Sequence, residues 1–420
     1  MLKYRAIKAV FDFAEKHESA NLFAVIMLHR QIHIGRKEIK KMKKVLSVVL
    51  ALVMVLSCTM FASAEGSSPV LRFNDDGEFK ILHLSDTQDG YPAHEEMLEF
   101  INHVLDKYDP DLVILGGDNT VGAAETKEEA IKELVAPFVE HEVYFTLVFG
   151  NHDREQGVSN EELLVMYQKA GGKYCLAYDA VPSISGVGNH NLPIFSSDNI
   201  LKVAYNLYMF DSGTGHYKDA HGNEGYECVY PDQIEWFERT NNVYTAANGG
   251  KVIPSMAFQH IIVGEIMDVF YKEAGPLSVY TKFCNGKNYD LLFGNFGAIK
   301  NGIILEPPCP GVENHGQFDA LVRQNTVAIF SGHDHINNFT VNHKGVDIVN
   351  TAGATFKSYG NDMARGARLI TLHEGKTEYD SQILTISEEV MDGADINYSK
   401  VTAFFGFIMG KIVTAFFAMF

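Results

Sequence analysis

The chain has 420 residues, of which 46% are hydrophobic, and a formal net charge of −18 at pH 7. This hydrophobic share is enough for one large or two small folded domains, so most of the chain is not a disordered polymer. The acidity argues against nucleic acid as a partner, because a negatively charged surface repels phosphate backbones.

The first 64 residues differ from the rest, and we expect 1–64 to be an N-terminal extension with a signal peptide. Basic residues up to Lys44 precede the apolar run Val45–Met60, and Ala62-Ser63-Ala64 follows as a small-x-small cleavage site. The run is short for a transmembrane helix, which needs about 20 residues, and a spanning segment is the less favoured alternative. The sequence therefore predicts an exported protein, secreted or held at the cell surface.

Cleavage after Ala64 would make the mature chain more acidic. Residues 1–64 carry 11 Lys and Arg and 4 Asp and Glu, which leaves 24 basic and 49 acidic residues and a net charge near −25. No nucleic acid is expected to bind such a surface, and small phosphorylated substrates become the favoured ligands.

The first part of the chain alternates between strand and helix patterns. Apolar, β-rich runs predict strands at Phe79–Leu84, Leu112–Leu115 and Tyr144–Phe149. Apolar residues at helical spacing predict helices at Glu95–Lys107, Ala130–Val139 and Glu161–Ala170. This order is typical of an α/β repeat with a parallel sheet.

From Ile200 onward the pattern becomes rich in strands and indicates a second sheet. The strands expected there are Val203–Phe210, Val252–Gln259, Asp290–Phe293, Val327–Phe330, Phe339–Val341, Asp347–Thr351 and Ala367–His373. Three turn-rich loops lie among them, at Pro182–Asn199, Asp211–Gly225 and Lys282–Gly316. Loops of this length in a compact domain commonly carry function.

Acid, amide and imidazole groups gather in five short segments, three of which follow the first three strands. The segments are Asp86-Thr87-Gln88, Gly117-Asp118-Asn119, Gly150-Asn151-His152-Asp153, Gln259-His260 and Gly332-His333-Asp334-His335. Ligands of open α/β sheets bind where strands end. Carboxylates, amides and neutral imidazoles suit Mn, Fe, Zn or Mg, and one carboxylate such as Asp118 can bridge two ions.

With these segments in order, the chain resembles the calcineurin-like metallophosphoesterase superfamily, whose motifs run D-x-H, G-D, G-N-H-D/E, a lone H and G-H-x-H. Four of the five motifs are intact. Tyr205-Asn206-Leu207-Tyr208 and the run from Gly332 to Phe339 are similar to the purple-acid-phosphatase-like branch. The resemblance implies an α/β fold, a two-sheet α/β/β/α sandwich, in a domain at 65–391.

The resemblance also implies a role for each motif residue. The first of two divalent or transition metal ions would be held by Asp86, Asp118 and His335. The second would be held by Asp118, Asn151, His260 and His333. His152 would contact the phosphate and protonate the leaving group, with Asp153 beside it to fix its tautomer.

Gln88 is the one departure, because the family pattern has a metal-binding His at this place. A neutral amide oxygen is a weaker transition-metal ligand than imidazole. We therefore expect Gln88 to ligate the first metal and to hold it less tightly, or to favour a harder ion. The Tyr that gives true purple acid phosphatases their colour is Val121 here.

The predicted function is hydrolysis of phosphate mono- or diesters of small molecules by a metal-bridging hydroxide at a dinuclear centre. One alternative is a metal-dependent surface binding or scaffold protein with decayed catalysis, which Gln88 would fit. A nuclease is a second alternative, which the acidic surface opposes.

Two features outside the motifs also carry expectations. Residues 392–420 form a polar linker and an apolar tail, and membrane contact through 401–420 is expected, with packing on the protein itself as the alternative. Four cysteines remain after export, and Cys284 with Cys309 is the preferred disulfide, against four free thiols.

Overall fold

The computed structural model describes residues 70–361 and 363–390. The predicted signal peptide, its cleavage site and the tail at 401–420 lie outside these ranges and stay predictions. Among the described helices, none has both the length and the apolar character that crossing a bilayer requires.

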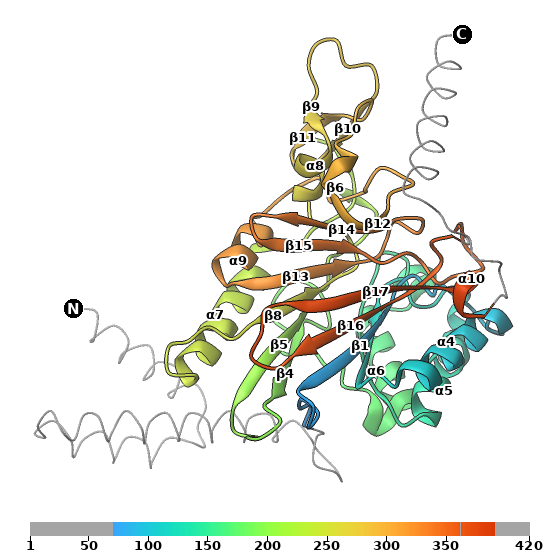
Figure 1. Ribbon diagram of the computed structural model, residues 1–420. Helices are drawn as coiled ribbons and strands as arrows, with labels where there is room; N and C mark the ends of the chain where they lie inside the picture. The colour runs from blue at the N-terminus through green and yellow to red at the C-terminus, as the bar shows by residue number, and fades with distance from the viewer. Residues whose placement is uncertain (1–69, 362, 391–420) are drawn as a thin grey trace, which may run out of the picture. The chain divides into compact units, whose positions relative to one another are not determined.

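The three predicted N-terminal strands lie side by side in a five-stranded sheet with the order β17-β16-β1-β2-β3 (Figure 1). β1 (Glu78–Leu84), β2 (Leu112–Gly116) and β3 (Tyr144–Val148) are parallel. β16 (Gly366–His373) pairs antiparallel with β1, and β17 (Tyr379–Thr385) pairs antiparallel with β16. The sheet therefore joins the start of the described chain to its end.

Three predicted helices cover one face of this sheet, and the first two of them connect its parallel strands. They are α4 (Glu95–Tyr108), α5 (Lys127–Glu140) and α6 (Asn160–Gly171). α6 begins with a capping box, in which Ser159 and Glu162 each accept a hydrogen bond from the other's backbone N–H. The helix-strand alternation predicted for this part is confirmed.

The second sheet has seven strands in the order β12-β14-β15-β13-β8-β5-β4. In chain order they are β4 (His190–Phe195), β5 (Val203–Met209), β8 (Ser255–Phe258), β12 (Ile299–Ile303), β13 (Thr326–Ser331), β14 (Asn338–His343) and β15 (Val346–Asn350). Its outer face is covered by α7 (Pro231–Ala247), α8 (Glu265–Phe270) and α9 (Gln317–Arg323) (Figure 1).

The two sheets pack face to face, and the alternation of side chains along β1 shows how. Phe79 and Ile81 belong to the apolar cluster between the sheets, whereas Leu82 and Leu84 belong to the cluster under α4, α5 and α6. Successive side chains of a strand point to opposite faces, so a strand covered on both sides is apolar at nearly every position. The predicted α/β/β/α sandwich is confirmed.

Several predicted element positions in the second half are wrong. The strand expected at Asp290–Phe293 is β11, which spans Lys287–Asp290. The predicted loops at Pro182–Asn199 and Lys282–Gly316 contain β4 and β12. The strand at Ala367–His373 is β16, which belongs to the first sheet and not the second.

The remaining elements are short. β6 (Tyr217–Lys218) pairs with β7 (Glu224–Gly225), and α10 (Ile386–Glu389) follows β17. Four 3-10 turns lie at Ala124–Thr126, Glu155–Gly157, Gly172–Tyr174 and Phe296–Ala298.

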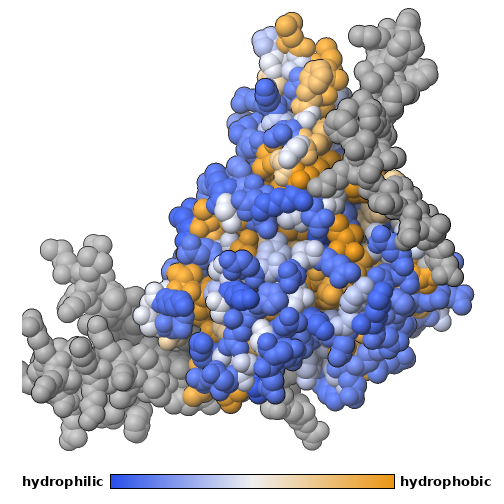
Figure 2. Space-filling view, viewed as in Figure 1, coloured by the Kyte–Doolittle hydropathy of each residue, from blue (hydrophilic) through white to orange (hydrophobic). Residues whose placement is uncertain are grey.

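Apolar residues are exposed around a three-stranded sheet with the order β10-β11-β9 (Figure 2). It consists of β9 (Lys272–Glu273), β10 (Thr281–Cys284) and β11. Leu277, Val279 and Phe293 in its connections are 94%, 87% and 80% exposed.

The preferred disulfide is not formed. Cys175, Cys228, Cys284 and Cys309 are all free thiols. The Nζ atom of Lys282 lies 2.7 Å from Sγ of Cys309 and donates to it. The structure therefore agrees with the alternative prediction of four free thiols.

Replacing Phe79 tests the core between the sheets. Phe79 is 1% exposed at the start of β1, so Phe79→Ala should lower the free energy of unfolding by about 3–5 kcal/mol, measured by urea denaturation. Phe293→Ala is the matched control, because that ring is 80% exposed and its loss should change stability by less than about 0.5 kcal/mol. Equal effects of the two substitutions would contradict the packing described here.

Candidate metal centre

The candidate ligands come from loops that follow five parallel strands of the two sheets. Parallel strands point their carboxyl ends toward the same edge, and side chains in the following loops meet there. Asp86 follows β1, Asp118 follows β2, Asn151 follows β3, His260 follows β8, and His333 and His335 follow β13.

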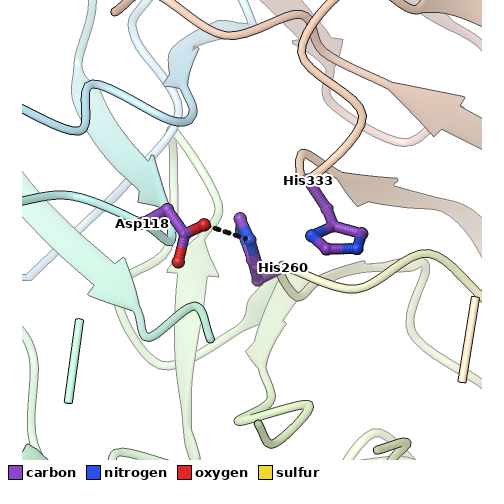
Figure 3. Close-up of side chains that lie close together, drawn as sticks. All are labelled: Asp118, His260 and His333. Carbon is purple, nitrogen blue, oxygen red and sulfur yellow. Dashed lines mark ion pairs between the residues drawn. The ribbon is translucent and has the colours of Figure 1, made fainter. Parts of the chain in front are cut away.

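Two groups of side chains have the spacing that a metal ion requires. One group is Asp86, Asp118 and His335, and the other is Asp118, His260 and His333. Within each group the potential ligand atoms lie within 4.8 Å of one another, and every member is buried. Asp118 belongs to both groups, and Figure 3 shows it facing His260 and His333. The two groups together contain five of the seven predicted metal ligands, and they share Asp118.

The two oxygens of Asp118 have different partners. Oδ2 lies 3.1 Å from Nε2 of His260 (Figure 3), and Oδ1 accepts a hydrogen bond of 2.7 Å from the backbone N–H of His152. The carboxylate therefore touches the second sheet through one oxygen and the loop after β3 through the other.

Backbone carbonyls orient two of the imidazoles. Nδ1 of His260 lies 2.9 Å from the carbonyl oxygen of Gly116, and Nδ1 of His335 lies 2.8 Å from that of Tyr359. Donation from Nδ1 leaves Nε2 of each ring as the basic nitrogen that faces the carboxylates. Nε2 of His335 is 3.3 Å from Oδ1 of Asp86.

Three further buried atoms test whether these residues suit metal ions. Nε2 of His333, Oδ1 of Asn151 and Oε1 of Gln88 have no hydrogen-bond partner among the described residues. Their side chains lie in residues that are at most 8% exposed. Leaving a buried polar atom unpaired is costly, and a cation would satisfy all three. The donor set of carboxylate, amide and imidazole therefore fits two metal ions, with Gln88 among the candidates.

At four of the candidate ligand positions the backbone adopts a left-handed conformation that residues other than glycine rarely take. Asp86, Gln88, Asp118 and His333 have φ angles of 48°, 39°, 49° and 72°. Residues in the left-handed region are uncommon outside glycine, and they cluster at functional sites.

Two motif glycines allow the loops to approach one another. A Cβ atom on Gly117, whose φ is +92°, would lie 2.6 Å from the His260 ring, and a Cβ on Gly150 would lie 2.2 Å from Oδ1 of Asp118. Any larger residue at either place would push a candidate ligand away.

Burial and charge shift the pKa values of the cluster in opposite directions. Burial alone would lower the pKa of His260, but the carboxylates of Asp118 and Asp86 outweigh burial and raise it to about 10. Burial, reinforced by the charge on His260, lowers the pKa of His333 to about 3. Burial would raise the pKa of Asp86, yet His260 and His335 hold it well below its usual range. The buried carboxylates thus demand positive charge, which a proton or a bound cation can supply.

His152 does not have the partner that the sequence suggested. Its Nδ1 lies 2.9 Å from Oε1 of Glu155, not beside Asp153, and its side chain is 42% exposed. The prediction that Asp153 fixes the tautomer of His152 is wrong, because Nδ1 of His152 pairs with Glu155 while the oxygens of Asp153 accept hydrogen bonds from backbone N–H groups. Glu155 was missed, although its position three residues after His152 allows contact within one turn.

Asp153 instead holds the loop backbone. Oδ1 accepts hydrogen bonds from the N–H groups of Asn119 and Thr120, at 2.9 and 3.2 Å, and Oδ2 accepts one of 2.8 Å from Gly150. Burial and the charge on Asp118 raise the pKa of Asp153 to about 6. Asp153 therefore positions the loops that carry Asp118 and Asn151.

Two tyrosines beside the cluster were also missed. Tyr226 packs edge-on against His333 at 4.2 Å between ring centroids, and Tyr359 stacks on His335 at 4.2 Å. Both come from segments distant in sequence, and no local pattern marks them.

Comparison with known proteins shows which family this chain belongs to. Residues 79–337 match the family model for calcineurin-like phosphoesterases, which is more than half of the chain. The chain belongs to the calcineurin-like phosphoesterase family. The predicted resemblance is thereby confirmed.

The relatives of this chain carry two kinds of name. "Probable inactive purple acid phosphatase 14" of Arabidopsis thaliana is 28% identical over 367 residues, covering 80% of this chain and 85% of the relative. "Phosphatase DCR2" of Saccharomyces cerevisiae is 27% identical over 291 residues, covering 64% of this chain and 46% of the relative. A solved dimetal phosphatase from Danio rerio has a TM-score of 0.44 and 11% identity, covering 73% of this chain and 99% of its own.

Gln88→His tests whether this side chain reaches the metal. An added imidazole nitrogen should tighten binding, so half of the metal should be lost at a chelator concentration roughly 10-fold higher, measured by elemental analysis after dialysis. Gln382→His is the control, because Gln382 is exposed on β17. Unchanged metal content and chelator sensitivity in Gln88→His would mean that Gln88 is not a ligand.

Proposed function

We propose that this protein is an exported, metal-dependent phosphoesterase that hydrolyses phosphate mono- or diesters of small molecules. One observation carries the proposal: two candidate metal groups share Asp118, and the backbone of His152 is fixed to the same carboxylate. A pair of cations held in this way suits in-line displacement at phosphorus, because each can neutralise one side of the reacting group.

In this proposal, different residues bind the metal ions and donate the proton. Two bound metal ions would supply positive charge for the phosphoryl oxygens and an activated water for the attack. Asp86, Asp118, Asn151 and the three histidines would hold them, with Gln88 on the first. His152, which is partly exposed, would meet the leaving oxygen and give it a proton.

Glu155 supports this role of His152. A carboxylate at 2.9 Å from Nδ1 favours a proton on that nitrogen, which fixes the ring orientation and leaves Nε2 to exchange protons with the substrate.

A metal-dependent binding or scaffold protein without catalysis is the second candidate. The name of the relative from Arabidopsis thaliana, which includes "probable inactive", favours it, as does Gln88 in place of the usual His. His152 with its partner Glu155 favours catalysis, because a protein that only binds needs no proton donor. A nuclease is disfavoured by the acidity of the chain.

Export and membrane contact belong to the proposal as well. The basic and apolar pattern ending at Ala64 supports cleavage and export, and the apolar composition of 401–420 supports contact with a membrane surface. Sequencing of the mature N-terminus, expected at Glu65, tests the first of these.

Asp118→Asn tests the shared metal ligand. Loss of one charge from both coordination spheres should lower bound metal and reduce turnover at least about 100-fold, the low end for a group that acts directly in catalysis. Metal content is measured by elemental analysis and turnover with an aryl phosphate, while circular dichroism verifies the fold. Wild-type rates in this variant would overturn the two-metal proposal, and metal binding without turnover in the wild type would favour the scaffold.

Glu155→Gln tests the orientation of the proton donor. With a neutral partner, turnover of alkyl phosphates should fall about 10-fold, and turnover of nitrophenyl phosphate should fall less, because nitrophenolate leaves without a proton. Glu99→Gln on α4 is the control, since Glu99 is exposed. Equal losses for both substrates would remove Glu155 from the proton-transfer role.

A further inference from the structure

The three most exposed large apolar side chains of the described residues, Leu277, Val279 and Phe293, lie at one end of the sheet β10-β11-β9. We call this end, with Tyr280 included, the apolar tip. The loop between β9 and β10 projects at the top of Figure 1, and Figure 2 shows hydrophobic residues gathered there. Exposed apolar groups that cluster in this way mark a surface for contact with another molecule or with lipid.

The register of the sheet brings two segments together at the tip. Thr281 at the start of β10 pairs with Asp290 at the end of β11. The N–H of Leu291 then donates a hydrogen bond of 2.9 Å to the carbonyl oxygen of Tyr280. The loop 274–280 and the segment that follows β11 therefore lie side by side, and their exposed side chains form one surface.

Hydrogen bonds and a buried base hold the tip in one shape. Oγ of Ser278 donates to Asp290 at 2.7 Å and accepts from the N–H of Gly275 at 3.1 Å. Below the loop, Tyr289 and Leu291 are 0% and 3% exposed and belong to the apolar cluster beneath α7, α8 and α9. Because the loop is already ordered, little conformational freedom is lost when its side chains bind.

The tip carries no charge of its own. Residues 274–280 and 291–299 contain no Asp, Glu, Lys or Arg, whereas 21% of the whole chain is charged. Two basic and two acidic residues balance one another at the base of the tip: Lys272, Lys282, Glu273 and Asp290. Anionic lipid would repel a chain with a net charge of −18, so a neutral bilayer fits this surface best.

The tip is too small for a stable contact between two proteins. Such an interface has about 20–30 residues on each side, and the tip offers four large exposed apolar side chains. A bilayer needs no matching surface, because each apolar side chain that enters it is removed from water by itself. Tyr280, which is 42% exposed, is of the residue type that is enriched where a membrane meets water.

We propose that the apolar tip inserts into the interface of a neutral lipid bilayer and holds the protein at the membrane surface. Leu277, Val279 and Phe293 enter the boundary of the acyl chains, and the ring of Tyr280 lies among the headgroups. The inference depends neither on the phosphoesterase function nor on the contact expected at 401–420, because these side chains belong to neither.

Partition of the full mature chain onto phosphatidylcholine vesicles, measured by sedimentation, tests the tip. The wild type should sediment with the vesicles. The triple variant Leu277→Ser, Val279→Ser, Phe293→Ser should partition at least about 10-fold more weakly, because apolar area that would leave water is lost. Equal partition of the wild type and this variant, or no binding by the wild type, would overturn the proposal.

A matched control removes as many exposed apolar side chains elsewhere. Val165 on α6 and Ile200 and Leu201 before β5 are 61%, 59% and 67% exposed and lie outside the tip. Their joint replacement by Ser should leave partition unchanged. An equal loss in this variant would contradict the assignment, because the overall hydrophobicity of the surface would then explain the binding.

Tryptophan fluorescence separates the tip from the segment 401–420. The chain has one tryptophan, Trp236, which is 4% exposed, so a second one can be read against it. Brominated phosphatidylcholine should quench the added fluorescence of Phe293→Trp and not that of Ile200→Trp. Vesicle binding without quenching at position 293 would mean that another segment makes the contact. Self-association that the triple variant abolishes, without lipid binding, would assign the tip to a second copy of the chain instead.

Discussion

The carboxylate of Asp118 must serve two groups at once, and the rest of the centre depends on how its oxygens are divided. One oxygen receives the backbone N–H of His152, and the other faces Nε2 of His260. The first contact fixes the loop after β3, and the second reaches the sheet that contains β8. Because ligands from both sheets meet at this residue, the packing of the two sheets also sets the distance between the candidate metal positions.

Sequence motifs could point to side chains that lie together in the structure, because each motif is local and follows a strand. They could not show that His152 contacts Glu155, since the direction of a side chain depends on the turn that carries it. The sheet membership of β16 was missed for a related reason. Strands buried on both faces have similar apolar patterns in either sheet, so the pattern of Ala367–His373 does not distinguish them.

The strained backbone and the unpaired buried polar atoms indicate metal binding, but they do not distinguish an enzyme from a protein that only binds metal. Asp86, Asp118 and His333 adopt left-handed conformations, and their loops leave unpaired buried atoms that a cation would satisfy. A scaffold that binds metal and an enzyme that uses it would need the same arrangement. Under the proposed function the pair of His152 and Glu155 separates the two cases, because only an enzyme needs a proton donor.

The position of β16 between β1 and β17 has a consequence for synthesis on the ribosome. β1 emerges early, but its second neighbour is encoded almost at the end of the described chain. Until then one side of β1 exposes unpaired N–H and C=O groups, which favour pairing with other chains. We therefore expect a chain that ends before β16 to be prone to aggregate, because β1 would keep an unpaired edge.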